Sequence, residues 1–257
     1  MNELHRISRR RAICAFGAAV ATGLASSCKG EGDVPAATRG ITRAEADTLA
    51  GILVANSKAG GADLRAEVPF GTATFHLDGS IDWANHVGRV TLRIELDGGT
   101  DPPQRDIVWN PNIVFEEVPG LGERIAAEGR PGIEWVARPL APRESVLHLI
   151  LRLINSTSST QPDNPQLLRS SVRWLRADSV DGTRVDVYRN DRTRYWVARS
   201  DRTLRRLEAD LAGTGSRATL TFADRAPRTI ETPPDPAIVA LSEVASIYQE
   251  LIGAEPD

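Results

Sequence analysis

The sequence predicts an α+β domain built on an antiparallel sheet, and three observations favour this class. Apolar residues recur at helical spacing in only a few segments, near both ends of the chain and once in its middle. Between these segments, apolar and polar side chains alternate with the period of a strand. Short turn sequences separate the alternating segments, and such one-sided alternation is typical of antiparallel strands, because parallel strands are buried on both faces. We expect one domain over residues 42–257.

The first 27 residues have the features of a bacterial export signal. Basic residues, among them Arg9–Arg11, precede the apolar run Ala12–Ala25, which is too short to span a membrane. Small residues then lead into Cys28, and this junction resembles a lipoprotein box. We therefore expect a signal peptide over 1–27 and lipidation of Cys28. Residues 8–13 also resemble the twin-arginine motif, so Sec and twin-arginine export both stay open. A soluble secreted protein and an uncleaved anchor are the alternatives.

Lipidation of Cys28 predicts an anchored protein on the extracytoplasmic face of the cell membrane, because two or three acyl chains hold a protein there stably. Residues 28–41 are small and polar, with proline and glycine, and are expected to form a flexible tether. Cys14 leaves with the signal, so the mature domain is expected to contain no intramolecular disulfide.

The first helix of the domain is expected over Thr42–Lys58. Thr42 and Glu45 have the spacing of a capping box. Apolar residues then recur on one face, and Gly60 and Gly61 end the helix.

Two groups of strands are expected after this helix, separated by a loop over 119–132 and by a further helix. Apolar residues of one parity alternate with polar residues of the other in each strand. The expected strands are residues 72–83, 88–96, 106–109, 112–117, 172–176, 184–188, 194–199, 204–211 and 218–224.

The most apolar helix of the domain is expected over residues 144–155, between the two groups of strands. Apolar side chains cover most of its circumference, and Ser145, His148, Arg152 and Asn155 form a narrow polar stripe at helical spacing. A short helix is expected near 166–170 and an amphipathic one over 236–252.

Composition and motifs exclude several functions. The net charge of −3 and the 5% aromatic content argue against a nucleic-acid partner. Two cysteines exclude a disulfide scaffold and a cysteine-rich zinc site. The sequence contains no nucleophile elbow, P-loop, H-E-x-x-H motif or paired C-x-x-C motif, so we expect no catalytic residue, cofactor or metal. His76 and His86 are expected to be surface residues. A hydrolase of unknown type stays a third hypothesis, since twin-arginine export carries folded cargo.

Several short motifs carry a resemblance to a known family. Phe75–Trp83 is similar to an "F-x-x-x-G-x-x-D" passage, and Val180–Thr183 to a recurrent "hydrophobic-D-G" turn. Tyr195–Val197 is similar to a "Y-W-V-D" strand, although Ala198 stands where aspartate is usual, and Leu204–Leu207 matches an "L-x-R" edge. With the order of elements, these motifs resemble the LppX/LprG-type lipoproteins, which share the fold of the LolA/LolB lipoprotein carriers.

The resemblance implies a strongly curved antiparallel sheet, a half-barrel, with helices packed on its concave side. It further implies an apolar cavity between the layers that holds a lipid or acyl chain without catalysis, with an envelope protein as a further partner. The alternative is an interaction, scaffold or sensor-associated lipoprotein with the same fold and a filled core. The candidates for the cavity lining are Phe75, Val90, Leu92, Ile94, Trp109, Val146, Leu147, Ile150, Leu151, Ile154, Trp174 and Trp196. The candidates for contact with a head group are His148 and Arg152.

Overall fold

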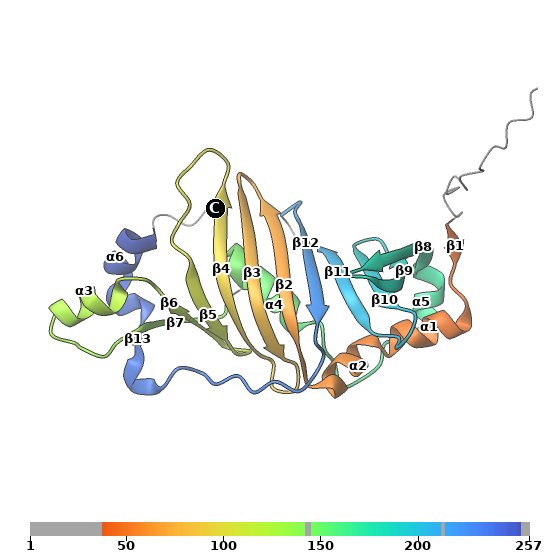
Figure 1. The fold of residues 1–257 in the computed structure, drawn as a ribbon, viewed down its shortest axis with the longest axis horizontal. Helices are drawn as coiled ribbons and strands as arrows, with labels where there is room; N and C mark the ends of the chain where they lie inside the picture. The colour runs from red at the N-terminus through yellow and green to blue at the C-terminus, as the bar shows by residue number, and fades with distance from the viewer. Residues whose placement is uncertain (1–37, 142–144, 212–213, 253–257) are drawn as a thin grey trace, which may run out of the picture. The chain divides into compact units, whose positions relative to one another are not determined.

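A computed structural model describes residues 38–141, 145–211 and 214–252. The expected signal peptide, Cys28 and most of the expected tether lie outside these residues. The described chain forms a 13-stranded sheet with helices, in the α+β class expected from the sequence (Figure 1).

The sheet is curved and unclosed, and neighbouring strands are antiparallel except at one edge. Its spatial order is β1-β8-β9-β10-β11-β12-β2-β3-β4-β5-β6-β7-β13, so the two strand groups separated by the central helix join in the middle through β12 and β2. They also join near the two edges, where β1 pairs with β8 and β13 with β7. The strands of the first group are β1 (Arg39–Gly40), β2 (Gly61–Phe70), β3 (Ala73–Asp82), β4 (Val87–Leu96), β5 (Arg105–Trp109), β6 (Ile113–Glu117) and β7 (Trp135–Pro139). Those of the second are β8 (Arg173–Val180), β9 (Thr183–Arg189), β10 (Thr193–Ala198), β11 (Leu204–Asp210), β12 (Arg217–Ala223) and β13 (Ile238–Ala240).

The described α-helices pack on the same face of the sheet, which we call the covered face. The helices are α1 (Arg43–Ala50), α2 (Ile52–Ala59), α3 (Leu121–Ala127), α4 (Val146–Asn155), α5 (Pro165–Ser171) and α6 (Leu241–Ile252). Side chains of α1, α2, α4 and α5 join the main core with strands β2–β6 and β8–β12, and those of α3 and α6 form a second core with β7 and β13. The strand register places the two cores on one face. Ile107 of the main core pairs with Glu116, and Glu116 pairs with Val136 of the second core, and directly paired residues point to the same side of a sheet.

The opposite face of the sheet is apolar only toward its two ends. Near one end, Trp196 packs with valines of β8 and β9, and near the other Val108, Phe115 and Trp135 pack beneath residues 230–238. The middle, over β2, β3 and β4, carries polar side chains such as Arg65. This arrangement explains why alternation is clearest in the central strands.

Four local expectations are corrected by the structure. The first helix is divided at Gly51 into α1 and α2. The expected loop over 119–132 contains α3, whose buried Leu121 and Ile125 were too few to give a helical period. Strands β2 and β7 were not predicted. The last helix begins at Leu241, because Ile238–Ala240 instead pair with β7 as a parallel strand.

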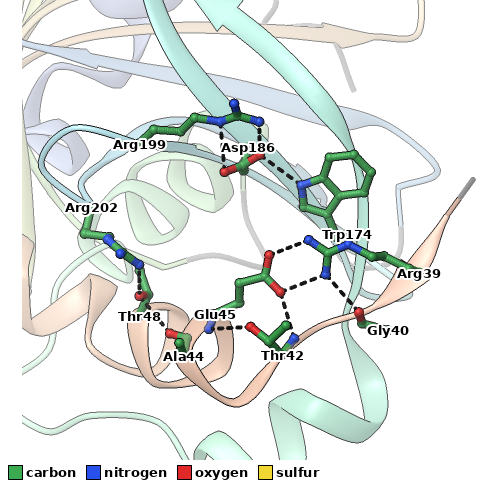
Figure 2. A network of polar contacts seen from close by, with 10 residues as sticks. All are labelled: Arg39, Gly40, Thr42, Ala44, Glu45, Thr48, Trp174, Asp186, Arg199 and Arg202. Atoms are coloured by element: carbon green, nitrogen blue, oxygen red, sulfur yellow. Dashed lines mark hydrogen bonds and ion pairs between the residues drawn. The ribbon is translucent and has the colours of Figure 1, made fainter. Parts of the chain in front are cut away.

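The start of the described chain is tied to the sheet by an arginine (Figure 2). Arg39 Nη2 lies 2.7 Å from Glu45 Oε1, and its guanidinium lies 4.8 Å from the centre of the Trp174 ring. Trp174 Nε1 donates to Asp186 Oδ1 at 3.0 Å, and Asp186 also pairs with Arg199. The last residues of the expected tether, Arg39 and Gly40, therefore form an edge strand.

This network predicts a local acid sensitivity at Glu45. The hydrogen bond from Arg39, with those of the capping box, lowers the pKa of Glu45 from its usual 4.5 to about 2, although burial opposes this. Because the folded-state pKa is depressed, the stabilisation is complete above about pH 4.5 and is lost as the pH falls toward 2. We expect the free energy of unfolding to fall across this window by about 1–2 kcal/mol more than in Glu45→Gln, after allowance for solvent screening at the half-exposed Arg39. Urea unfolding at a series of pH values measures this difference. Exposed Asp47→Asn is the control, and parallel curves for the wild type and Glu45→Gln would contradict the prediction.

Candidate functional site

The expected cavity residues gather in the main core, with one exception. Nine are buried there, and Val146 and Trp174 pack against it partly exposed. Trp196 lies on the opposite face, where its Nε1 donates to Asp178. The nine buried residues are Phe75, Val90, Leu92, Ile94, Trp109, Leu147, Ile150, Leu151 and Ile154.

Helix α4 lies across the covered face as an apolar layer (Figure 1), and its described polar ties to the strands and to α2 lie near its C-terminal end. Trp109 Nε1 donates to Asn155 Oδ1 at 2.9 Å, and Trp83 Nε1 to Thr157 Oγ1 at 3.0 Å. Asn56 Nδ2 also donates to the Thr157 carbonyl at 2.7 Å. These bonds satisfy buried polar groups that would otherwise be costly to enclose. They hold α4 to the strands and to α2 at one end.

The Trp109 ring lies close enough to the neighbouring strand to need a glycine opposite it. Trp109 and Gly88 are cross-strand partners on β5 and β4, and a Cβ at Gly88 would collide with the ring. Gly88 therefore makes room for the ring and so allows the side chain to reach Asn155.

The two head-group candidates do not form one site. His148 is 1% exposed, and its Nδ1 lies 3.0 Å from the carbonyl and 3.1 Å from the amide of Ala141. Arg152, one turn later, is exposed to solvent. The structure thus assigns His148 a contact with the segment before α4, and the polar stripe divides between the interior and the surface.

A small apolar pocket opens between the helices and the sheet, with a volume of about 140 Å³. Its walls come from α1, α2, α4, α5 and strands β10 and β11, and none of the expected cavity residues lines it. The apolar faces of the expected helices already include several of the lining residues. Which of these residues meet around one pocket depends on how the helices pack, and the sequence does not show this. The apolar lining consists of Leu49, Ile52, Leu53, Leu153, Leu168, Val172, Tyr195, Leu207 and Ala209, and the polar lining of Ser156, Thr157, Asp163 and Thr193.

A buried charged cluster lies on the covered face between the two cores. Glu116 Oε2 accepts from Arg105 Nη1 at 3.0 Å and from the Tyr248 hydroxyl at 2.7 Å. Glu116 Oε1 pairs with Arg138 Nη2. The side chains of Arg105 and Glu116 are each 1% exposed. This cluster joins α6 to β5, β6 and β7.

A larger hollow, of about 610 Å³, lies on the polar middle of the opposite face. Charged side chains such as Arg65, Glu67 and Arg93 line it, and His76 is there with its Nε2 3.5 Å from Glu95 Oε2. The lining of this hollow is mainly polar and carries charges of both signs. Ligand pockets, in contrast, are mostly apolar with a few polar groups. Size alone therefore does not identify the site.

The described residues offer little for metal chemistry or for membrane crossing. No three histidine, cysteine, aspartate or glutamate side chains among them come close enough together to hold a metal ion. None of the helices in this part of the chain has an apolar stretch long enough to cross a bilayer.

These features define a class of protein, a curved and unclosed antiparallel sheet with every described α-helix on one face and an apolar interior between the layers. No protein family model matches the chain, and no curated protein matches it. Among solved structures, the chain is similar to LprF from Mycobacterium bovis, with 12% identity and a TM-score of 0.46 over 76% of this chain and 99% of that chain.

Two further solved structures are similar to the chain. An uncharacterized conserved protein from Thermus thermophilus has 10% identity and a TM-score of 0.38, over 76% of this chain and 99% of that chain. A domain from Vibrio parahaemolyticus assigned to an outer membrane lipoprotein-sorting protein has 10% identity and a TM-score of 0.25, over 72% of this chain and 95% of that chain. At these identities and TM-scores the ligand must be inferred from the site itself.

Proposed function

We propose that the protein is an envelope lipoprotein, anchored through lipidated Cys28, that binds or carries a lipid or acyl chain without catalysis. In this proposal, residues 1–27 are a signal peptide, residues 28–41 a tether and residues 42–257 the binding domain. The observation that carries it is the apolar pocket between α1, α2, α4, α5 and the sheet. An acyl chain needs only apolar contact, and each buried methylene contributes about 0.8 kcal/mol.

The volume of the pocket requires that the helices move when a ligand binds. About 140 Å³ is below the roughly 300–1,000 Å³ of sites for drug-sized ligands. The described polar ties of α4 to the sheet and to α2 lie near its C-terminal end, and the side chains that α4 contributes to the main core are apolar. Apolar contacts are non-directional, so the helices can move away from the sheet when an acyl chain enters, and the chain then covers the apolar side chains that were in contact before.

The small pocket also favours a second candidate, a scaffold or sensor-associated lipoprotein whose core is filled. In that case the covered face serves only to stabilise the fold, and the protein acts through its surface.

Lipid extraction and mass spectrometry of the purified full-length chain carrying Cys28→Ala distinguishes the two. This variant has no acyl group at residue 28, so an extracted lipid occupies the fold. We expect a stoichiometric lipid, and we also expect the variant to leave the membrane fraction. A stable protein that is free of lipid, and that takes up no fluorescent fatty acid when reloaded, would favour the scaffold.

Two neighbouring leucines of α5 provide a matched test of the pocket. Leu168 lines it, whereas Leu167 is 66% exposed. Leu168→Trp is expected to fill the pocket and lower fatty-acid affinity at least tenfold, and Leu167→Trp to leave it unchanged. Titration of a fluorescent fatty acid measures both, and equal affinities in the two variants would place the ligand elsewhere.

A further inference from the structure

Three arginines occupy directly opposed positions on three neighbouring strands. Arg189 of β9 pairs with Arg173 of β8 on one side and with Arg194 of β10 on the other. Like charges at directly opposed positions in a sheet destabilise it. The fold therefore holds a local concentration of positive charge that strand pairing itself does not favour.

The positive charge of this row is only partly compensated. Arg194 Nη1 lies 3.0 Å from Glu208 Oε2. Arg173 Nη1 donates only to the carbonyls of Ser170 and Val172, and neither Arg173 nor Arg189 has an ion pair with a carboxylate of the described residues. Both side chains are exposed, so an anion from solution can reach them.

The row borders a hollow of about 250 Å³, which we call the arginine hollow. Arg217 adds a fourth guanidinium, which is already paired with Asp210 at 2.7 Å, and Asp191 is the one carboxylate of the lining among the described residues. Guanidinium groups present a planar fork of donors that matches phosphate oxygens in a bidentate manner. The chemistry of the hollow therefore fits an oxyanion.

The arginine hollow and the apolar pocket lie on opposite faces of the sheet and approach each other around the ends of its strands, because the three arginines alternate with Trp174, Tyr188 and Tyr195 of the main core. Thr193 lines both, and the consecutive residues Val172 and Arg173 line the pocket and the hollow respectively. The two meet where β8 and β10 begin and β9 ends. A molecule whose anionic group is joined to an apolar chain, and which passes around these strand ends, would contact both surfaces.

We propose that the arginine hollow binds a phosphate-class oxyanion, and that this anion is the head group of the lipid whose chain occupies the apolar pocket. The proposal rests on the proposed lipid-binding function and deepens it. It assigns the head group to Arg173, Arg189 and Arg194, in place of His148 and Arg152.

Two lipids that differ only in the phosphate test this proposal. Oleoyl lysophosphatidic acid and mono-oleoyl glycerol, each below its micellar concentration, are titrated into the full-length Cys28→Ala chain. We expect the phosphate lipid to bind at least tenfold more tightly. Adding Arg173→Gln and Arg189→Gln is expected to abolish this preference without changing the affinity for the neutral lipid. Arg189→Lys, which keeps the charge but not the planar fork, is expected to give an intermediate preference.

The matched control removes two arginines from the polar middle of the same face of the sheet. Arg65→Gln with Arg93→Gln changes the net charge equally, and both arginines have carboxylate partners. This control is expected to keep the full preference. Unfolding midpoints of all variants exclude misfolding as the cause, and removal of like charges is not expected to lower them.

The outcomes separate the two proposals. Equal binding of both lipids by the parent chain would overturn the arginine hollow and leave lipid binding intact, as would loss of preference in the control alone. If neither lipid binds, lipid binding fails, and inorganic phosphate then decides the chemistry of the hollow. If the parent chain binds inorganic phosphate and the double variant Arg173→Gln, Arg189→Gln does not, the arginine hollow is a site for free oxyanions. If the parent chain binds no phosphate, the arginine hollow is overturned as an oxyanion site.

Discussion

Replacing Glu116 with alanine is expected to lower the free energy of unfolding by about 3–5 kcal/mol, because it removes a buried carboxylate that pairs with two arginines. Arg105 is enclosed to the same degree as Glu116, and removal of a buried charge costs far more than the net contribution of the pair. Urea unfolding measures the change.

Two further variants define the origin of this effect. Glu117, the next residue, is exposed on the other side of the strand, so Glu117→Ala is expected to change stability by less than about 0.5 kcal/mol. Tyr248→Phe removes the hydroxyl that donates to Glu116 and accepts from Arg105, and is expected to cost about 1–2 kcal/mol. A loss below about 1 kcal/mol for Glu116→Ala would contradict the importance of the cluster.

Replacing Trp83 with alanine is expected to cost about 3–5 kcal/mol and to loosen the end of α4. The ring is 0% exposed and lies 5.5 Å from the ring of Phe222, with the Arg225 guanidinium 4.9 Å from its centre. Its Nε1 also donates to Thr157 just after α4, so the substitution removes packing and a polar tie together. Urea unfolding gives the first effect, and faster amide hydrogen exchange over 154–158 gives the second.

The conservative variant separates packing from the hydrogen bond. Trp83→Phe keeps an apolar ring and loses the bond to Thr157, so it is expected to cost about 1–2 kcal/mol while still raising exchange after α4. Unchanged exchange in both variants would show that Trp83 does not hold this helix end.

The class of the fold and most strands of the central sheet, though not β2, follow from side-chain alternation. Phe75 and Leu92 lie at alternating positions of strands whose other side chains are polar, so only one register buries the apolar set. The apolar helix over residues 144–155 was equally evident, since few polar side chains interrupt it. These features depend on the residues of each segment alone, and the tertiary contacts of the structure are consistent with them.

The features that the sequence could not provide depend on packing between distant segments. Trp196 lies in a strand with apolar residues of both parities, so alternation could not assign its face. Ile238–Ala240 pair as a strand because β7 offers an edge, which nothing within that segment indicates.

The sequence by itself determined the α+β class, the helix that covers the sheet and the apolar set that forms most of the interior, because helical and strand periods are properties of short segments. The tertiary structure alone decided which of these residues meet. It buried His148 against Ala141, enclosed Glu116 between two arginines, and aligned Arg173, Arg189 and Arg194 on the face of the sheet opposite to the apolar pocket, at the strand ends that border it. The physical reason is that strand register and helix packing bring together residues that are distant in the chain, and the local pattern contains no information about their partners.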